Sequence, residues 1–154
     1  MRVIVLIFML LNFARAEDGE IGVVYDLTTM DVKTFENKIL KGVPFYKSYY
    51  EGDLKDLSVT IVIHGSAFKF FTKEKENKIV KRDQEYYEVH DEIKKRISLL
   101  KEYYDVEFLM CEVGMYRVGL EKKDILDFVV LIPTSTIGLI DKQNEGYAYI
   151  PVLD

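Results

Sequence analysis

Short apolar runs alternate along the chain with amphipathic stretches, and this pattern predicts alternating strands and helices. Four runs, residues 21–25, 59–63, 106–110 and 128–132, are rich in β-branched and aromatic side chains. Runs that are apolar at nearly every position are typical of strands buried on both faces of a sheet. A fifth strand is expected at residues 147–152.

Segments with helical spacing lie between these runs. The first of these segments covers residues 32–42. Thr28 and Asp31, directly before it, form a possible capping box, and Gly42 is the expected end of the helix. Pro44 is then expected to start a second short helix, because proline is favoured in the first turn. The pattern therefore predicts two separate helices between the first two strands.

The later connections follow the same logic. Apolar residues recur every three or four positions over residues 85–104, which predicts the longest helix. The very polar stretch before it, residues 73–83, predicts an exposed loop. Short helices are expected around residues 66–71 and 115–119 and directly after the turn at residues 134–136, whose hydroxyl side chains can cap a helix.

Strand and helix alternate along the whole chain. This alternation predicts an α/β fold, a three-layer α/β/α domain with a mainly parallel sheet of about five strands. In such sheets ligands bind at the carboxyl ends of the strands, which lie along one edge. The order of the strands within the sheet does not follow from the sequence.

The first 16 residues have the layout of a secretory signal peptide. Arg2 precedes an apolar run from residue 3 to residue 13, and Ala14-Arg15-Ala16 fits a cleavage site. We therefore expect a leader at residues 1–16, a domain at residues 17–154, and a periplasmic or secreted protein. A buried first strand and an uncleaved anchor are the alternatives. No later segment is apolar enough to span a membrane, so no membrane association is expected once the leader is removed.

Composition and charge narrow the function classes. The chain has one cysteine and a formal net charge of −5. A single cysteine excludes an intramolecular disulfide and a cysteine-rich metal site. The acidic balance argues against nucleic acid as a partner, because phosphate binding needs a basic surface. Since no nucleotide-binding or metalloprotease motif occurs, no cofactor and no metal are expected.

Cys111 and His64 are the candidate catalytic residues. Cys111 follows a predicted strand and precedes a short helix, where backbone amides can favour the thiolate that disulfide exchange or persulfide transfer requires. His64 ends another strand and could pair with Cys111 or bind an anion. A buried, inert cysteine and a hydrogen-bonded histidine remain the alternatives. A metal site of His64, Cys111 and His90 is a third hypothesis, without ligand-type spacing.

Three segments together resemble the DsrE/DsrF-like family. They are VTIVIHGSAFKFF, VEFLMCEVGMYRVGL and FVVLIPTSTIGLIDKQNEGYAYIPV, which match in order the family's strand with His-Gly, its strand with Cys, and its closing strand, helix and strand. The resemblance implies a small α/β domain that forms oligomers, often trimers or hexamers. In the sulfur-relay members, a cysteine at the position of Cys111 carries sulfur as a persulfide.

Two functions follow as expectations. The first is an exported DsrE-like protein that binds or relays sulfur through Cys111, with His64 and the 134–136 turn shaping the pocket and a sulfur-donor or acceptor protein as partner. The second is a non-enzymatic oligomeric binding or scaffold module in which Cys111 is structural. The sulfur-relay members act in the cytoplasm, whereas this chain is expected to be exported. The resemblance therefore supports the fold more strongly than it supports the reaction.

Overall fold

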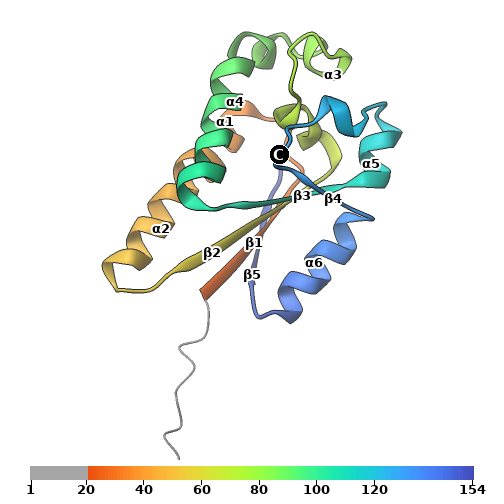
Figure 1. Cartoon of the computed structure of the whole chain (residues 1–154). Coiled ribbons are helices and arrows are strands. Elements are labelled where there is room, and N and C mark those ends of the chain that lie inside the picture. The colour runs from red at the N-terminus through yellow and green to blue at the C-terminus, as the bar shows by residue number, and fades with distance from the viewer. Residues whose placement is uncertain (1–20) are drawn as a thin grey trace, which may run out of the picture.

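The computed structural model describes residues 21–154, and the predicted leader lies outside the described residues (Figure 1). A single parallel sheet of five strands runs through this part of the chain, in the order β4-β3-β2-β1-β5. The strands are β1 (Ile21–Leu27), β2 (Leu57–Ile63), β3 (Glu107–Cys111), β4 (Val130–Ile132) and β5 (Ala148–Val152). The α/β prediction is confirmed, and every described strand pairing is parallel.

Helices connect the strands in sequence order. They are α1 (Val32–Phe35), α2 (Gly42–Gly52), α3 (Lys78–Lys81), α4 (Gln84–Tyr104), α5 (Glu112–Arg117) and α6 (Ser135–Asn144). A π-helical turn, Glu36–Lys41, joins α1 to α2, and 3-10 segments occupy Gly65–Phe71 and Lys122–Asp124. Within residues 21–154, no helix combines the length and apolar character needed to cross a bilayer.

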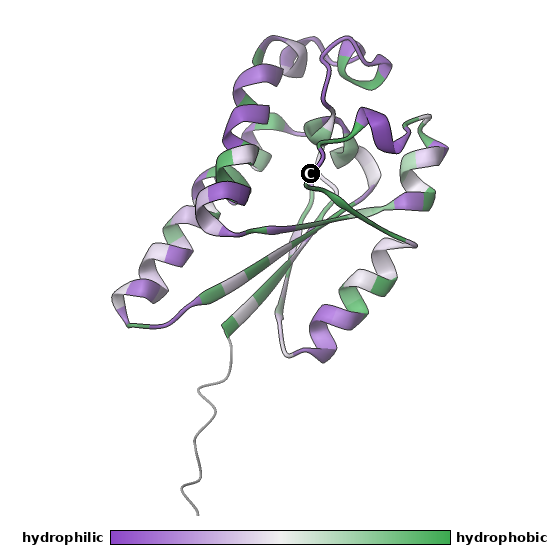
Figure 2. Cartoon of the chain, in the orientation of Figure 1, coloured by the Kyte–Doolittle hydropathy of each residue, from purple (hydrophilic) through white to green (hydrophobic). Residues whose placement is uncertain are grey.

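The helices cover the two faces of the sheet unequally, which produces three layers. Figure 1 shows α1, α2 and α4 on one side of the sheet and α6 on the other. Side chains of alternate strand positions, such as Tyr25 and Ile61, join the large core under the first group of helices. The intervening positions Val24, Val62 and Leu109 form a smaller core with α6. Figure 2 shows the resulting hydropathy pattern, with apolar strands and polar outer helix surfaces.

Close approach of α6 to the sheet depends on Gly138. A Cβ at this position would lie 2.5 Å from Cδ1 of Ile132 and 3.5 Å from Cγ2 of Val62. Any larger side chain would therefore force at least the end of the Ile132 side chain to move. Thr134 begins α6, since its hydroxyl accepts a hydrogen bond from the N–H of Ile137 at 3.4 Å. The capping role expected of this turn is confirmed.

The prediction that a helix ends at Gly42 is wrong. Helical backbone continues from α1 through the π-helical turn into α2, and Gly42 has φ −65° and ψ −47°, ordinary right-handed helical angles. Pro44 lies inside this continuous helix and does not open a new one. Because proline lacks an N–H and its ring meets the carbonyl four residues earlier, a regular helix is strained there. The π-helical turn lies shortly before Pro44, where the regular backbone hydrogen bond is missing.

Two local predictions also need correction. The polar stretch 73–83 contains the short helix α3, which Asn77 caps and whose Val80 is fully buried. Two adjacent apolar side chains among charges, Ile79 and Val80, give no periodicity from which to predict it. The first capping residue is Asp31, whose carboxylate accepts a hydrogen bond from the N–H of Thr34 at 2.6 Å. Thr28 instead donates its backbone N–H to Val152.

Candidate functional site

The two candidate residues lie at the same edge of the sheet. Ile63 of β2 pairs with Met110 of β3. His64 comes directly after Ile63 and Cys111 directly after Met110, so the two residues follow a paired position on neighbouring strands. The backbone N–H of His64 donates to the carbonyl of Leu27, which keeps the end of β1 in the same row. Parallel pairing thus brings three strand ends together at the edge where parallel sheets bind ligands.

Cys111 ends β3 and caps α5. Its Sγ accepts a hydrogen bond from the N–H of Gly114 at 3.4 Å. Only 8% of the residue is exposed, and it joins the main core. An N–H that points at sulfur favours a negatively charged sulfur over a neutral thiol. The position therefore combines a feature of reactive cysteines with the burial of structural ones.

His64 belongs to a three-residue polar network. Its Nε2 lies 2.5 Å from Oδ1 of Asp26, and the hydroxyl of Tyr149 donates to Oδ2 of the same carboxylate at 2.6 Å. A carboxylate only accepts, so the histidine carries a proton on Nε2 and donates through it to Asp26. The Asp26 carboxylate raises the pKa of Tyr149, because the hydrogen bond and the negative charge favour the neutral phenol.

The network draws on three strands that are far apart in sequence. Asp26 lies in β1, His64 follows β2, and Tyr149 lies in β5. The register between β1 and β5 sets Asp26 opposite Pro151, two residues beyond Tyr149 on the same face of the sheet. Asp26 and Tyr149 were not predicted as site residues. Asp26 stands at a predicted strand end, but only the strand order reveals that β5 lies beside β1.

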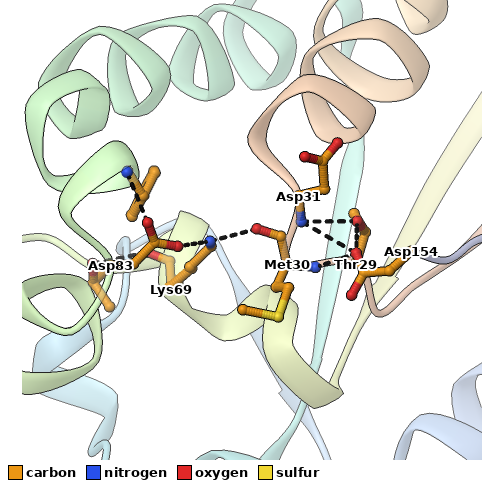
Figure 3. Close-up of polar contacts among 8 residues, drawn as sticks. Thr29, Met30, Asp31, Lys69, Asp83 and Asp154 are labelled. Carbon is orange, nitrogen blue, oxygen red and sulfur yellow. Dashed lines mark hydrogen bonds and ion pairs between the residues drawn. The ribbon is translucent and has the colours of Figure 1, made fainter.

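The loop after β1 forms the next part of the edge. Figure 3 shows the Asp154 carboxylate against this loop, where it accepts hydrogen bonds from the Thr29 hydroxyl and from the N–H of Met30 at 2.8 Å and of Asp31 at 3.2 Å. The Thr29 hydroxyl and these amides lower the pKa of Asp154. One carboxylate thus fixes the loop between β1 and α1.

The buried Lys69 ammonium holds the other side of that loop. It donates to the carbonyl of Met30 at 2.5 Å and to the carboxylate of Asp83, and it lies 4.9 Å from the ring centroid of Phe70 (Figure 3). Burial alone would raise the pKa of Asp83, but hydrogen bonds from Lys69 and from the N–H of Tyr86 bring the pKa below its usual value. Asp83 therefore stays ionised at neutral pH and places its negative charge against the Lys69 side chain.

The structure does not bring His90 to the candidate site. This histidine is fully buried on α4, where its Nε2 lies 3.2 Å from the carbonyl of Thr72 and its Nδ1 lies 3.1 Å from Asp91. Across residues 21–154, no group of three or more His, Cys, Asp or Glu side chains could hold a metal ion. Thr134 follows β4, with β3 between it and β2, and caps α6.

Comparisons with other proteins agree with the fold. A solved structure of a protein of unknown function from Methanobacterium thermoautotrophicum superposes with a TM-score of 0.59. It is 21% identical, and the match covers 85% of this chain and 98% of that one. An uncharacterized protein from Aquifex aeolicus (strain VF5) is 37% identical over 59 residues, which are 38% of this chain and 26% of that protein. This chain thus spans about a quarter of that relative's length.

A family profile covers nearly the whole described chain. The profile of the DsrE/DsrF-like family matches residues 16–152, which include all five strands, Cys111, and the Asp26, His64 and Tyr149 network. The three segments that suggested the resemblance contribute β2, β3, β4 and β5 to the one parallel sheet. The chain belongs to the DsrE/DsrF-like family.

Proposed function

We propose that this protein carries sulfur as a persulfide on Cys111. The observation that supports the proposal most is the position of Sγ at the carboxyl end of β3, with the N–H of Gly114 donating to it. An N–H donor stabilises a thiolate, and equally the negatively charged outer sulfur of a persulfide held close by. Membership of the DsrE/DsrF-like family supports the same reaction class.

The transfer needs no external oxidant. The Cys111 thiolate attacks the terminal sulfur of a donor persulfide, and a new S–S bond forms while the S–S bond of the donor breaks. The donor leaves as a thiolate, and the proton of the terminal S–H moves with the transferred sulfur. A thiolate on an acceptor protein then removes the outer sulfur by the same exchange and restores Cys111.

His64 is the proposed acceptor of the Cys111 thiol proton. The carboxylate of Asp26 fixes its Nε2–H, so the basic Nδ1 remains for proton transfer. Tyr149 donates to the other oxygen of Asp26 and holds this carboxylate in place. We expect His64→Gln to slow alkylation of Cys111 at neutral pH by about tenfold or more, with a smaller effect at high pH where the thiol ionises unaided. An equal decrease in the alkylation rate at all pH values would contradict this role for His64.

Mass spectrometry of the intact protein tests the sulfur transfer. After incubation with a low-molecular-weight persulfide, the wild-type protein should gain about 32 Da, and a reductant should remove the added mass. Cys111→Ser is the matched control and should gain nothing, because the chain has no other cysteine. An unchanged wild-type mass, or the same gain on Cys111→Ser, would contradict the proposal.

A structural Cys111 is the second candidate function, and the 8% exposure of this residue favours it. In that case the protein is a binding or scaffold module, and the thiol packs against its neighbours as a small apolar group. The folded protein would then resist alkylating reagents until it unfolds. Rapid alkylation of the native protein, at rates well above its unfolding rate, would exclude this candidate.

We also propose self-association and export. Exposed aromatic side chains on α2 support a homo-oligomer, since Phe45, Tyr46 and Tyr49 are 66%, 45% and 63% exposed. Light scattering should give the mass of a trimer or hexamer, and a monomer at micromolar concentration would refute it. The mature protein recovered from cells should lack residues 1–16, as N-terminal sequencing can establish. Retention of Met1 would argue against cleavage.

A further inference from the structure

A pocket of about 380 Å³ opens at the carboxyl edge of the sheet. Met30 follows β1, Gly65 and Ser66 follow β2, and Val118 lies at the end of α5 after β3, and all four line it. The volume is within the range of pockets that hold small molecules, about 300–1,000 Å³. Because three strand ends contribute, the pocket lies where open parallel sheets usually bind ligands.

The polar side chains of the pocket leave one positive charge in excess. Lys69 and Asp83 neutralise each other, and the ammonium is further occupied by the carbonyl of Met30 (Figure 3). Arg82 also lines the pocket, is exposed, and makes no ion pair within residues 21–154. A guanidinium with free donors matches a carboxylate in shape and charge. The charge therefore selects a ligand with one anionic group.

The rest of the wall is apolar. Met30, Phe68, Ile79 and Val118 supply hydrocarbon and aromatic surface to the lining. A ligand that fits would place its carboxylate at Arg82 and a short apolar body against these side chains. This combination excludes a bare inorganic anion as the best ligand, because such an ion would leave the apolar wall in contact with water.

Phe68 lines this pocket and also lies close to the thiol. A Cβ on Gly114 would lie 2.8 Å from Cζ of Phe68 and 3.3 Å from Sγ of Cys111. The phenyl ring and the sulfur thus both pack closely against Gly114, where there is no room for a Cβ. Phe68 is 2% exposed and also lines the pocket.

We propose that the pocket binds a small organic carboxylate and that Phe68 gates its passage to Cys111. For the sulfur carrier, the ligand would be a low-molecular-weight persulfide with a carboxylate, and this last step rests on the proposed function. Transfer within the pocket moves the terminal sulfur to Cys111 and releases the donor as a thiolate that still bears its carboxylate. Binding and gating themselves do not depend on persulfide chemistry.

Two alkylating reagents of similar size distinguish attraction of a negative charge from steric access to the Cys111 thiol. Iodoacetate carries a carboxylate and iodoacetamide does not, and Cys111 is the single thiol in the chain. In the wild-type protein, Arg82 should raise the ratio of the iodoacetate rate to the iodoacetamide rate by about fivefold. Arg82→Gln should abolish that increase. Lys78→Gln removes one exposed positive charge from α3 outside the pocket and should leave the ratio unchanged. Equal ratios for all three proteins would overturn the carboxylate site.

A pair of phenylalanine variants tests the gate. Phe68→Leu should accelerate both reagents about tenfold, because it shortens the side chain that covers Sγ. Phe71→Leu is the control, as this ring is equally buried and packs against Phe35 and Phe108. Equal acceleration by both, or no alkylation of either, would overturn the gate. If the variants show the expected alkylation rates but the protein forms no persulfide adduct, only the sulfur carrier is refuted. If the adduct forms but the alkylation rates do not differ as expected, only the pocket is refuted.

Discussion

Removal of the Asp83 charge should destabilise the protein through Lys69. The two side chains form an ion pair in which the lysine side chain is 6% exposed and the aspartate 24%. Asp83 also caps α4, because its Oδ1 accepts a hydrogen bond from the N–H of Tyr86 at 3.0 Å. Asparagine caps helices about as well as aspartate. Asp83→Asn therefore removes the charge and leaves the cap.

The expected loss is about 3 kcal/mol. Loss of one partner of a buried pair costs roughly 3–5 kcal/mol, because the remaining charge is buried without compensation. The lower end applies, since the partial exposure of Asp83 lets water reach the pair. The carbonyl of Met30 and the rings of Phe70 and Tyr86 still contact the ammonium. The loss corresponds to a decrease of about 10 °C in Tm for a domain of this size.

Urea unfolding and thermal unfolding measure this loss. Asp31→Asn is the matched control, because Asp31 also caps a helix but pairs with no buried cation, and it should change stability by less than about 0.5 kcal/mol. The double variant Lys69→Met with Asp83→Asn should recover most of the loss, since no buried charge remains. A loss below about 1 kcal/mol for Asp83→Asn would refute the reasoning.

The pH dependence gives a second readout of the same pair. The pKa of Asp83 is below its usual value in the folded protein. Such a group stabilises the fold fully above its unfolded pKa, about 3.9, and this contribution disappears as the pH falls through the folded value. Wild-type stability should therefore decrease below about pH 4. Asp83→Asn should lose less over the same interval, and parallel acid curves would contradict this assignment.

The remaining predictions concern packing and capping. Gly114→Ala should cost about 1–3 kcal/mol in urea unfolding, because the added Cβ would lie 2.8 Å from Phe68. Gly52→Ala, at the end of α2 where nothing lies within 4 Å, should instead be neutral or stabilise by up to about 1 kcal/mol. Thr134→Ala should cost about 1 kcal/mol, since the N–H of Ile137 loses its acceptor, and Thr134→Ser should restore most of it.

The fold could be predicted because its signals are local. Each strand is a short apolar run, and each long helix has a polar side and an apolar side, so alternation alone predicts the class and its layers. Errors arose where a tertiary effect overrides a local one. Gly42 lies within a helix because packing of Leu40 and Val43 against the core continues across it. Val80 forms part of the core although the stretch around it is mostly charged.

The candidate site could be predicted only in part. His64 and Cys111 were predicted because strand ends can be read from the sequence, and their placement on neighbouring strands follows from the observed order. Asp26 and Tyr149 could not be paired in advance, since 123 positions separate them and no pattern indicates that β5 lies beside β1. The pocket could not be predicted from the sequence either, because its wall comes from segments after three different strands.

Burial of Cys111 does not by itself separate a carrier from a structural thiol. A persulfide or thiolate in contact with solvent is oxidised or captured in mixed disulfides, most readily in an oxidising compartment. A carrier gains from a covered sulfur, provided that one route leads to it. In the proposed arrangement Phe68 is the cover, and the pocket beside it, with Arg82 in its lining, is the route that selects a reagent. A purely structural cysteine needs the cover but has no use for the route. A protein that forms the persulfide adduct on Cys111 and also responds to Arg82→Gln therefore fits the carrier, whereas the response without the adduct leaves only a binding pocket.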